Sequence, residues 1–332
     1  MRIAILDYKD AVPTCVTGPA DIWGGLSRMY PLATGIPLKE NIEIDFIAEA
    51  DGQLTRRPQG SNKAEKLNPR DRYRLIIIPA MRYDKIDEVI AREGRLVTWL
   101  KQQRQKGADL ASICVGAFLL AETGLLNGKK ATTNWLFAGR FQQRYPAIGV
   151  QDDKIIVDEG PVCSCGGAFS FTSFMIYLIE KLIGHEEAVM ASKILMINTH
   201  GDSQLAFSVF RFQHDHADDP VKKIQHFIEA NYGEAIILEK LASDHHMSVR
   251  NFIRRFRQAT GNTPMEYLQR VRIEAAKKLL ENTRESVESV ALQCGYEDIS
   301  FFRKVFRRQV DMSPKEYHLK YGKLSERQVL KA

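Results

Sequence analysis

Short apolar runs alternate with longer stretches of helical periodicity over residues 1 to about 200. The runs are short and rich in β-branched residues, which predicts strands. The predicted strands are Arg2–Asp7, Ile42–Ala48, Arg74–Pro79, Asp109–Cys114, Lys130–Thr133 and Lys154–Asp158. The predicted helices are Pro19–Tyr30, Lys85–Lys106, Val115–Thr123, Leu136–Arg144, Gly166–Ile183 and His185–Ile197. This alternation predicts an α/β fold with a mostly parallel, doubly wound sheet, and the polar stretch Asp51–Arg72 predicts a surface loop.

The last third of the chain changes to an all-helical pattern that repeats with a spacing of 50 residues. The repeated positions are Phe252, Phe256, Pro264 and Tyr267 in the first copy and Phe302, Phe306, Pro314 and Tyr317 in the second. Each copy predicts a short helix, a turn, and a second helix with aromatic residues on one face and Arg or Lys on the other. Two such helix-turn-helix units indicate a protein that reads two stretches of one DNA duplex.

The first copy predicts a supporting helix at Leu238–Ser243 and a recognition helix that Ser248 caps and that ends before Gly261. Guanidinium groups opposite the buried aromatic face suit guanine O6 and N7 or phosphates, and an isoleucine suits a thymine methyl. The candidate DNA-binding residues of this copy are Ser248, Arg250, Ile253, Arg254 and Arg257.

The second copy predicts support from Val287–Gln293, a turn at Cys294-Gly295 and a recognition helix at Ser300–Gln309. Its candidate DNA-binding residues are Ser300, Arg303, Lys304 and Arg307. Thr263 and Pro264 predict the start of a connecting helix that extends to about Leu280, and successive major grooves on one DNA face require about 34 Å between the units. A solvated helix face would explain one basic stripe, but two stripes in register favour DNA binding.

The charge of the chain is concentrated in the repeated segment. From Val221 onward there are 21 Lys and Arg against 14 Asp and Glu, whereas the first 220 residues hold 26 against 27. This distribution favours phosphate neutralisation by the C-terminal part. The five cysteines fit a reducing cytoplasm, the N-terminus has the pattern of a buried strand instead of a signal peptide, and no apolar run predicts a membrane span.

A polar, His- and Asp-rich segment separates the two patterns. It predicts a domain division into 1–200, a linker at 201–220, a DNA-binding domain at 221–322 and a tail at 323–332. His214 and His216 beside three aspartates could bind a metal. We interpret them as part of a solvated linker, because no other ligands complete a site in the sequence. No metal or cofactor is therefore expected.

Residues from about Ile224 to Tyr321 resemble the DNA-binding domain of the AraC family of bacterial transcription regulators. The motifs that carry the resemblance are Leu241-Ala242, Ser248-Val249-Arg250, Phe256-Arg257, Gly261-Asn262-Thr263-Pro264, Arg272-Ile273-Glu274-Ala275-Ala276, Cys294-Gly295-Tyr296 and Ser313-Pro314-Lys315-Glu316-Tyr317. One departure is Val310-Asp311, where the family usually carries Phe or Tyr followed by Gly. A different tight turn is possible at that point.

The stretch from Ala111 to Ala121 places Cys114 at a strand-to-helix turn with Gly116 two residues later. This is the geometry of a nucleophile elbow, where the helix N-terminus is expected to lower the thiol pKa. With Leu125–Trp135, it resembles the PfpI-like branch of the class I glutamine amidotransferase superfamily. In particular it is similar to the N-terminal domain of GlxA-type AraC regulators, so a flavodoxin-like doubly wound sheet is expected over about residues 1–200.

Three departures from that family argue against catalysis. Asn134 stands where the family has a histidine, and asparagine cannot act as a general base for a thiol. Cys15 aligns with an acidic residue of hydrolytic relatives, and Pro79-Ala80-Met81 replaces Pro-Gly-Gly. We therefore expect a non-catalytic domain with an effector pocket at Cys15, Cys114, Asn134 and Trp135. Two alternatives for Cys114 stay open: a small apolar turn residue, or a redox sensor with Cys15.

The motifs and the two resemblances together predict a cytoplasmic transcription regulator, in particular an activator, that binds double-stranded DNA and a small-molecule effector. The resemblance implies that the first half carries dimer contacts, so a homodimer is expected, and it adds RNA polymerase as an expected partner. No membrane partner is expected, because no apolar run is long enough to span a bilayer. One rival hypothesis is a cysteine amidase, peptidase or glyoxalase-type enzyme with a DNA-binding tail. A second is an architectural nucleic-acid binder whose N-terminal domain takes no ligand. Trp23 and Trp135 could form an aromatic wall, although a buried core position is the simpler interpretation of a tryptophan.

Overall fold

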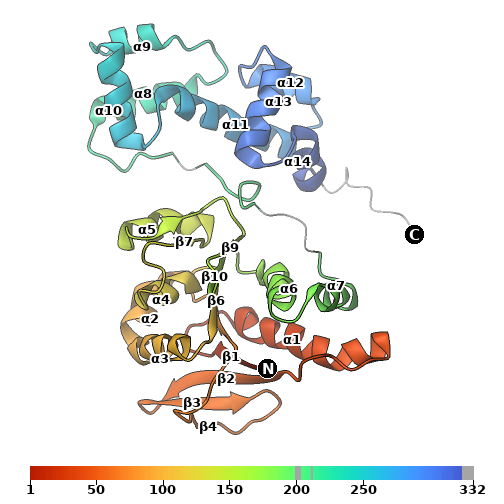
Figure 1. The fold of residues 1–332 in the computed structure, drawn as a ribbon. Coiled ribbons are helices and arrows are strands. Elements are labelled where there is room, and N and C mark those ends of the chain that lie inside the picture. Colours follow the sequence, from red (N-terminus) through yellow and green to blue (C-terminus); the bar gives the residue numbers. More distant parts are fainter. Residues whose placement is uncertain (199–202, 211, 324–332) are drawn as a thin grey trace. The chain divides into compact units, whose positions relative to one another are not determined.

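A computed structural model of the protein describes residues 1–198, 203–210 and 212–323 (Figure 1). Contacts divide the chain into two compact units, Met1–Gln204 and Leu205–Ala332. The predicted tail at 323–332, apart from Lys323, lies outside the described residues, as do 201, 202 and 211 of the predicted linker.

The first unit is built on an eight-stranded sheet with the order β4-β3-β2-β1-β5-β6-β10-β9. Five central strands pair in parallel: β2 (Glu43–Ala50), β1 (Arg2–Leu6), β5 (Leu75–Ile78), β6 (Asp109–Ile113) and β10 (Val162–Cys165). Antiparallel strands complete both edges: β3 (Gln53–Pro58), β4 (Glu65–Lys66) and β9 (Ile156–Asp158). The parallel order 2-1-3-4-5 is that of the flavodoxin-like doubly wound sheet, which confirms the predicted fold class.

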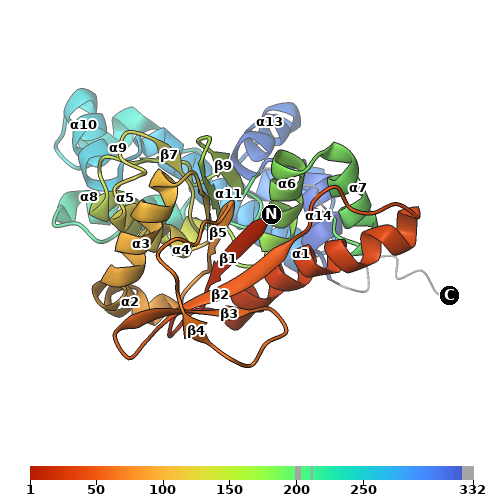
Figure 2. The same cartoon turned by 60° about the horizontal axis from the view of Figure 1, so that its bottom comes forward.

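Helices cover both faces of this sheet (Figures 1 and 2). On one face α1 (Pro13–Thr34), α6 (Phe171–Leu182) and α7 (His185–Ile194) pack together. On the other lie α2 (Ile86–Arg92), α3 (Gly94–Gln105) and α4 (Gly116–Glu122). The smaller elements are η1 (Tyr83–Lys85), η2 (Trp135–Phe137), α5 (Ala138–Arg144) and the parallel pair β7 (Lys130–Ala131) and β8 (Gly149–Val150). Strands β1 and β5 are almost fully buried, as expected for a sheet with two covered faces.

Several predicted elements differ from the observed ones. The stretch Asp51–Arg72 is not simply a surface loop, because it contains β3 and β4. The predicted helix at Lys85–Lys106 is divided into η1, α2 and α3, with the second break at Glu93. The predicted strand at Lys130–Thr133 pairs with β8 outside the main sheet, and β10 lies within a segment for which no strand was predicted.

The second unit is all-helical, as predicted. Its helices are α8 (Asp219–Ala230), α9 (Leu238–Asp244), α10 (Val249–Thr260), α11 (Pro264–Asn282), α12 (Val287–Gln293), α13 (Ile299–Val310) and α14 (Pro314–Tyr321). They bury two separate hydrophobic clusters, one around Phe252 and Phe256 and one around Phe302 and Phe306. All four rings are fully buried, as the 50-residue repeat predicts.

The two clusters repeat the same ring geometry. Phe256 packs edge-on against Tyr267 with ring centroids 5.4 Å apart, and Phe306 packs likewise against Tyr317 at 5.6 Å. Capping boxes open both following helices, at Thr263 of α11 and Ser313 of α14. Sequence duplication is therefore matched by duplication of the packing and of the caps.

The segment before α8 differs from the solvated linker predicted at 201–220. Ala206 is buried in the cluster around Phe302, and the ring of Phe210 packs against Tyr267. The Phe210 amide donates to Glu274, and Lys277 donates to the Ser208 carbonyl. These contacts attach 206–210 to the all-helical unit.

Candidate nucleic-acid interface and cysteine turn

The first predicted recognition helix is α10. The Ser248 hydroxyl accepts from the amide of Asn251, and Gly261 ends the helix with a φ of +73°, so both predicted ends are confirmed. Burial of the aromatic face turns the opposite stripe outward: Arg250, Arg254 and Arg257 are exposed and Ile253 is half-buried. The stripe carries three guanidinium groups on one accessible face, where base edges or phosphates could be contacted.

The second predicted recognition helix is α13, and its exposed residues include Ser300, Arg303, Lys304 and Arg307. The side chain of Asp298 caps it by accepting from the amides of Ser300 and Phe301. Asp311 ends the helix in the left-handed region, with a φ of +59°. A tight turn therefore does form at Val310-Asp311. Asp311 ends α13 in the same way as Gly261 ends α10.

Two of the predicted arginines have partners within the protein. The Arg254 guanidinium donates to Asn251 and Gln258 on its own helix. Arg303 donates to Glu288 of α12 at 2.6 Å, and both side chains are more than half exposed. An exposed pair of this kind is weak, so it can exchange for a phosphate contact at little cost. DNA contact by the nine predicted residues stays a prediction.

Helix α11 connects the two helix-turn-helix units and contacts both hydrophobic clusters. Its 19 residues correspond to a length of roughly 28 Å at about 1.5 Å per residue. This is comparable to the repeat of about 34 Å between successive major grooves on one face of DNA. A continuous helix of this length is a suitable rigid spacer.

In the first unit, Cys114 forms the predicted strand-to-helix turn between β6 and α4. Its φ is +55°, which is unusual for a residue other than glycine. The Cys114 amide donates to the Cys165 carbonyl at 2.7 Å, and the Cys114 carbonyl accepts from the Thr133 hydroxyl at 3.0 Å. Gly116 permits the close approach of the backbone, because a Cβ there would lie 2.4 Å from the Pro79 carbonyl oxygen. The elbow geometry is confirmed.

The expected lowering of the Cys114 pKa is wrong. Burial raises the pKa of this thiol to about 12, which outweighs hydrogen bonds from the backbone amides of Val115, Ala168 and Asn134. The side chain is completely buried, and so is Cys15, whose pKa burial also raises. The desolvation free energy of a buried thiolate exceeds the stabilisation that the helix N-terminus supplies, so the neutral thiol is the favoured form of Cys114.

The other two predicted pocket residues, Asn134 and Trp135, are less buried than Cys114. Asn134 is half-buried and its side chain caps η2 by accepting from Leu136. Trp135 is half-buried, whereas Trp23 is fully buried in the core, so the two do not form an exposed aromatic wall. The single histidine in residues 1–198, His185, is exposed and pairs with Glu180. It is therefore not positioned as a base on the buried Cys114.

The first unit also has a shallow groove that no sequence pattern predicted, with a volume of about 610 Å³. It is lined by residues of α2, α3 and β3 that include Leu54, Arg92, Arg95 and Trp99. Its β3 wall lies in the stretch predicted as a loop. No helix in the described part of the chain is long and apolar enough to cross a membrane.

Family comparisons match both units. Residues 241–320 match the helix-turn-helix domain family, and residues 65–181 match the DJ-1/PfpI family. The HTH-type transcriptional regulator CdhR of Pseudomonas aeruginosa is 26% identical over 300 residues, which cover 89% of this chain and 87% of that protein. The regulator GbdR of the same organism is 27% identical over 231 residues, which span 66% of this chain and 60% of GbdR.

Among solved structures, the DNA-binding domain of AdpA in complex with a target DNA is 36% identical, with a TM-score of 0.30. That alignment covers 31% of this chain and 94% of the AdpA domain. The order of the two matched families along the chain is the one predicted from the motifs. The chain therefore combines a DJ-1/PfpI domain with a C-terminal AraC-type helix-turn-helix domain, which is the architecture of a DNA-binding transcription regulator.

Proposed function

We propose that α10 and α13 enter successive major grooves of one duplex. The proposed contacts are Ser248, Arg250, Ile253, Arg254 and Arg257 on the first unit and Ser300, Arg303, Lys304 and Arg307 on the second. The observation that carries this proposal is the duplicated pair of helices, each with fully buried aromatic rings and an exposed basic stripe. Helix α11 supports it as a spacer of suitable length.

The test begins with selection of a preferred sequence from random duplex DNA by the full-length chain. Footprinting on that sequence should show two protected segments about one helical turn apart. Arg254→Ala should alter protection of one segment and Lys304→Ala that of the other. A single protected segment, insensitive to one of these changes, would contradict reading by both units.

The proposed role of the DJ-1/PfpI domain is sensing without catalysis. Three observations support it: Cys114 is a buried neutral thiol, Asn134 caps a helix, and His185 pairs with Glu180. The proposed effector site is the carboxyl edge of the sheet around Cys15, Cys114, Asn134 and Trp135, where doubly wound folds bind ligands. Thermal unfolding of the full-length chain against amino acids, quaternary amines, polyamines and aldehydes tests it. Concentration-dependent stabilisation that Trp135→Ala abolishes would support it.

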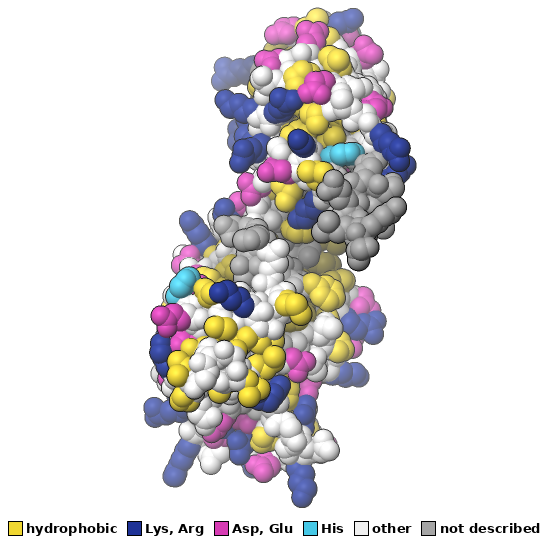
Figure 3. Space-filling model, turned by 90° about the vertical axis from the view of Figure 1, so that its right-hand side faces the viewer, with side chains coloured by type: hydrophobic (Ala, Val, Ile, Leu, Met, Phe, Trp, Pro, Cys, Tyr) yellow, Lys and Arg dark blue, Asp and Glu magenta, His cyan; other side chains and the backbone are white. Residues whose placement is uncertain are grey.

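A homodimer is the proposed assembly, acting in the cytoplasm because its target is chromosomal DNA. Hydrophobic side chains gather on the N-terminal unit on the side where α1, α6 and α7 lie (Figure 3). On and just beyond α1, Met29, Leu32 and Ile36 are 42%, 85% and 57% exposed. Exposed apolar groups of this kind favour a protein contact. Leu32→Glu should shift the chain from dimer to monomer in sedimentation, and an unchanged mass would exclude this face.

Transcriptional activation, through contact with RNA polymerase, is the proposed output. It rests on the resemblance to the family. Run-off transcription from a promoter that carries the selected site tests it, because an activator raises the transcript yield and a repressor lowers it.

A further inference from the structure

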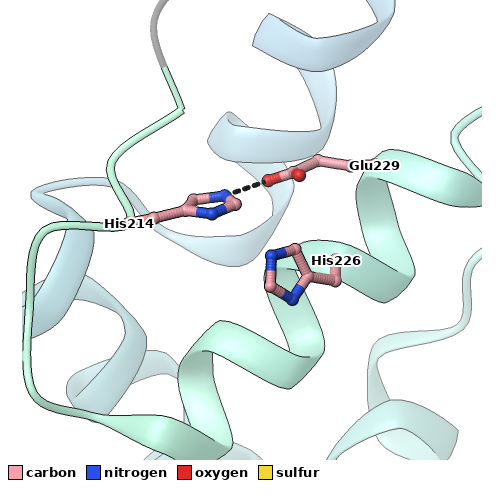
Figure 4. Close-up of side chains that lie close together, drawn as sticks. All are labelled: His214, His226 and Glu229. Atoms are coloured by element: carbon pink, nitrogen blue, oxygen red, sulfur yellow. Dashed lines mark hydrogen bonds and ion pairs between the residues drawn. The ribbon is translucent and has the colours of Figure 1, made fainter.

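A cluster of two histidines and a glutamate lies at the start of the all-helical unit (Figure 4). One nitrogen each from His214 and His226 and a carboxylate oxygen of Glu229 lie within 4.8 Å of one another. His226 and Glu229 are three residues apart on α8 and therefore share a face of that helix. His214 comes from the segment before α8, so the cluster joins two parts of the chain.

The three side chains already face one another. Nε2 of His214 lies 2.8 Å from Oε1 of Glu229, and the rings of His214 and His226 meet edge to face with centroids 4.7 Å apart. His214 and Glu229 are partly buried, whereas His226 is exposed. Solvent therefore reaches the cluster from the side of His226.

We propose that His214, His226 and Glu229 bind a divalent transition-metal ion of the Zn²⁺ type. A site with two imidazole ligands favours such ions over Mg²⁺ or Ca²⁺, which prefer ligand sets made of oxygen atoms alone. Bonds of about 2.0–2.1 Å place tetrahedral ligand atoms roughly 3.3 Å apart, so small side-chain rotations bring this set to binding distance. Three protein ligands leave one tetrahedral coordination position open, and a water molecule can occupy it from the exposed side of the cluster.

A second layer of hydrogen bonds orients the carboxylate. The Tyr267 hydroxyl donates to Oε1 of Glu229 at 2.5 Å, and the buried Gln225 donates to the same hydroxyl oxygen at 3.1 Å. Metal-binding sites commonly hold their ligands with such outer partners. Gln225 also lies 2.8 Å from Nε2 of His216, so that histidine is engaged elsewhere. The two proposed histidine ligands are therefore His214 and His226, whereas the sequence pattern pointed to His214 and His216.

The simpler alternative is a hydrogen-bonded pair of His214 and Glu229 with no ion. The two cases differ at His226, which such a pair does not need and which a metal ion does. Binding would also strengthen the link between His214 and α8, which a hydrogen bond to Glu229 already joins. This proposal replaces the expectation from the sequence that no metal site exists.

The experiment uses the full-length chain without a polyhistidine tag, after a chelator has removed any bound metal ions. Calorimetric titration with Zn²⁺ should show one ion per chain, and His226→Ala should weaken binding at least about tenfold. His185→Ala is the matched control, because His185 is also an exposed histidine beside a glutamate. Native and control chains should bind equally.

Co²⁺ provides the second measurement. The bound ion should show tetrahedral visible bands without the intense near-ultraviolet absorption of thiolate ligands, because all five cysteines are buried outside the cluster. Absence of binding, equal binding by native and His226→Ala chains, or a thiolate band would each overturn the proposal. His226→Gln, with circular dichroism to verify folding, separates loss of a ligand from loss of structure.

Discussion

The Tyr267 hydroxyl donates a 2.5 Å hydrogen bond to Oε1 of Glu229 and thereby ties α11 to α8. Tyr267 is fully buried, and Glu229 is largely covered. Tyr267→Phe should keep the ring packing on Phe256 and lose this bond, together with the hydrogen bond that Gln225 donates to the hydroxyl oxygen. Because a carboxylate acceptor loses one of its partners and the buried Gln225 amide loses an acceptor, we expect a loss of about 1–3 kcal/mol in unfolding free energy.

Urea unfolding of the full-length chain measures this effect with a built-in reference. All three tryptophans lie in the first unit, so fluorescence follows that unit, whereas far-ultraviolet circular dichroism also reports the helices of the second. Tyr267→Phe should shift the dichroism transition alone. Tyr317→Phe, which removes the equivalent bond to Glu281, is the matched variant in the other half. An unchanged dichroism midpoint would show that the bond contributes nothing net.

The ends of α10 and α13 permit a reciprocal test of backbone strain. Gly261 and Asp311 occupy equivalent positions with φ values of +73° and +59°. Asp311→Gly should stabilise the chain by roughly 0.5–1 kcal/mol, because glycine takes this conformation without steric cost. Gly261→Asp should destabilise it by a similar amount. If both substitutions changed the dichroism midpoint in the same direction, left-handed strain would not be the cause.

The duplicated unit could be predicted from sequence because its signals are local. Ser248, Thr263 and Pro264 act within one helical turn, and the phenylalanine spacing of four sets the buried face. Helix α10 therefore begins at the predicted residue. The edge strands β3 and β4 were missed because their polar sequence, with half-buried residues such as Arg56 and Arg57, resembles that of a loop.

Site properties that depend on burial were less accessible. The position of Cys114 at a turn followed from the pattern, but its pKa is raised by burial in the folded domain, which outweighs a backbone hydrogen bond from the distant Ala168. Similarly, nothing in the spacing of His214 and His226 shows that the chain reverses to bring them together. Tertiary packing supplied both results, and single-sequence periodicity carries no information about it.

DNA affinity should depend equally on the two basic stripes. Arg257 and Arg307 are exposed, and they are equivalent residues of α10 and α13. Each change to alanine should cost about 1–3 kcal/mol of specific binding if the side chain reads a base, and the two losses should add. If the residue contacts a phosphate instead, the slope of the logarithm of the binding constant against the logarithm of salt concentration should decrease by about one. The sequence preference should then stay unchanged. Lys278→Ala, an exposed cation of α11, is the control in fluorescence anisotropy. Equal loss with Lys278→Ala would indicate unspecific charge attraction.

The buried thiol of Cys114 predicts how the stability of the first unit depends on pH. Its pKa is about 12 in the folded chain against 9.0 for an ordinary cysteine, so above pH 9 the folded state holds the proton more strongly than the unfolded state. Folding stability therefore decreases as the pH rises from about 9 to 12, and below pH 9 the contribution is fully present. The native chain should accordingly lose more stability than Cys114→Ser between pH 8 and pH 10 in urea unfolding followed by tryptophan fluorescence.

Iodoacetamide should react slowly with native Cys114 at pH 8, because the neutral thiol is a poor nucleophile. Rapid alkylation, together with a pH dependence identical to that of Cys114→Ser, would show instead an accessible thiolate and would reopen the redox-sensor hypothesis.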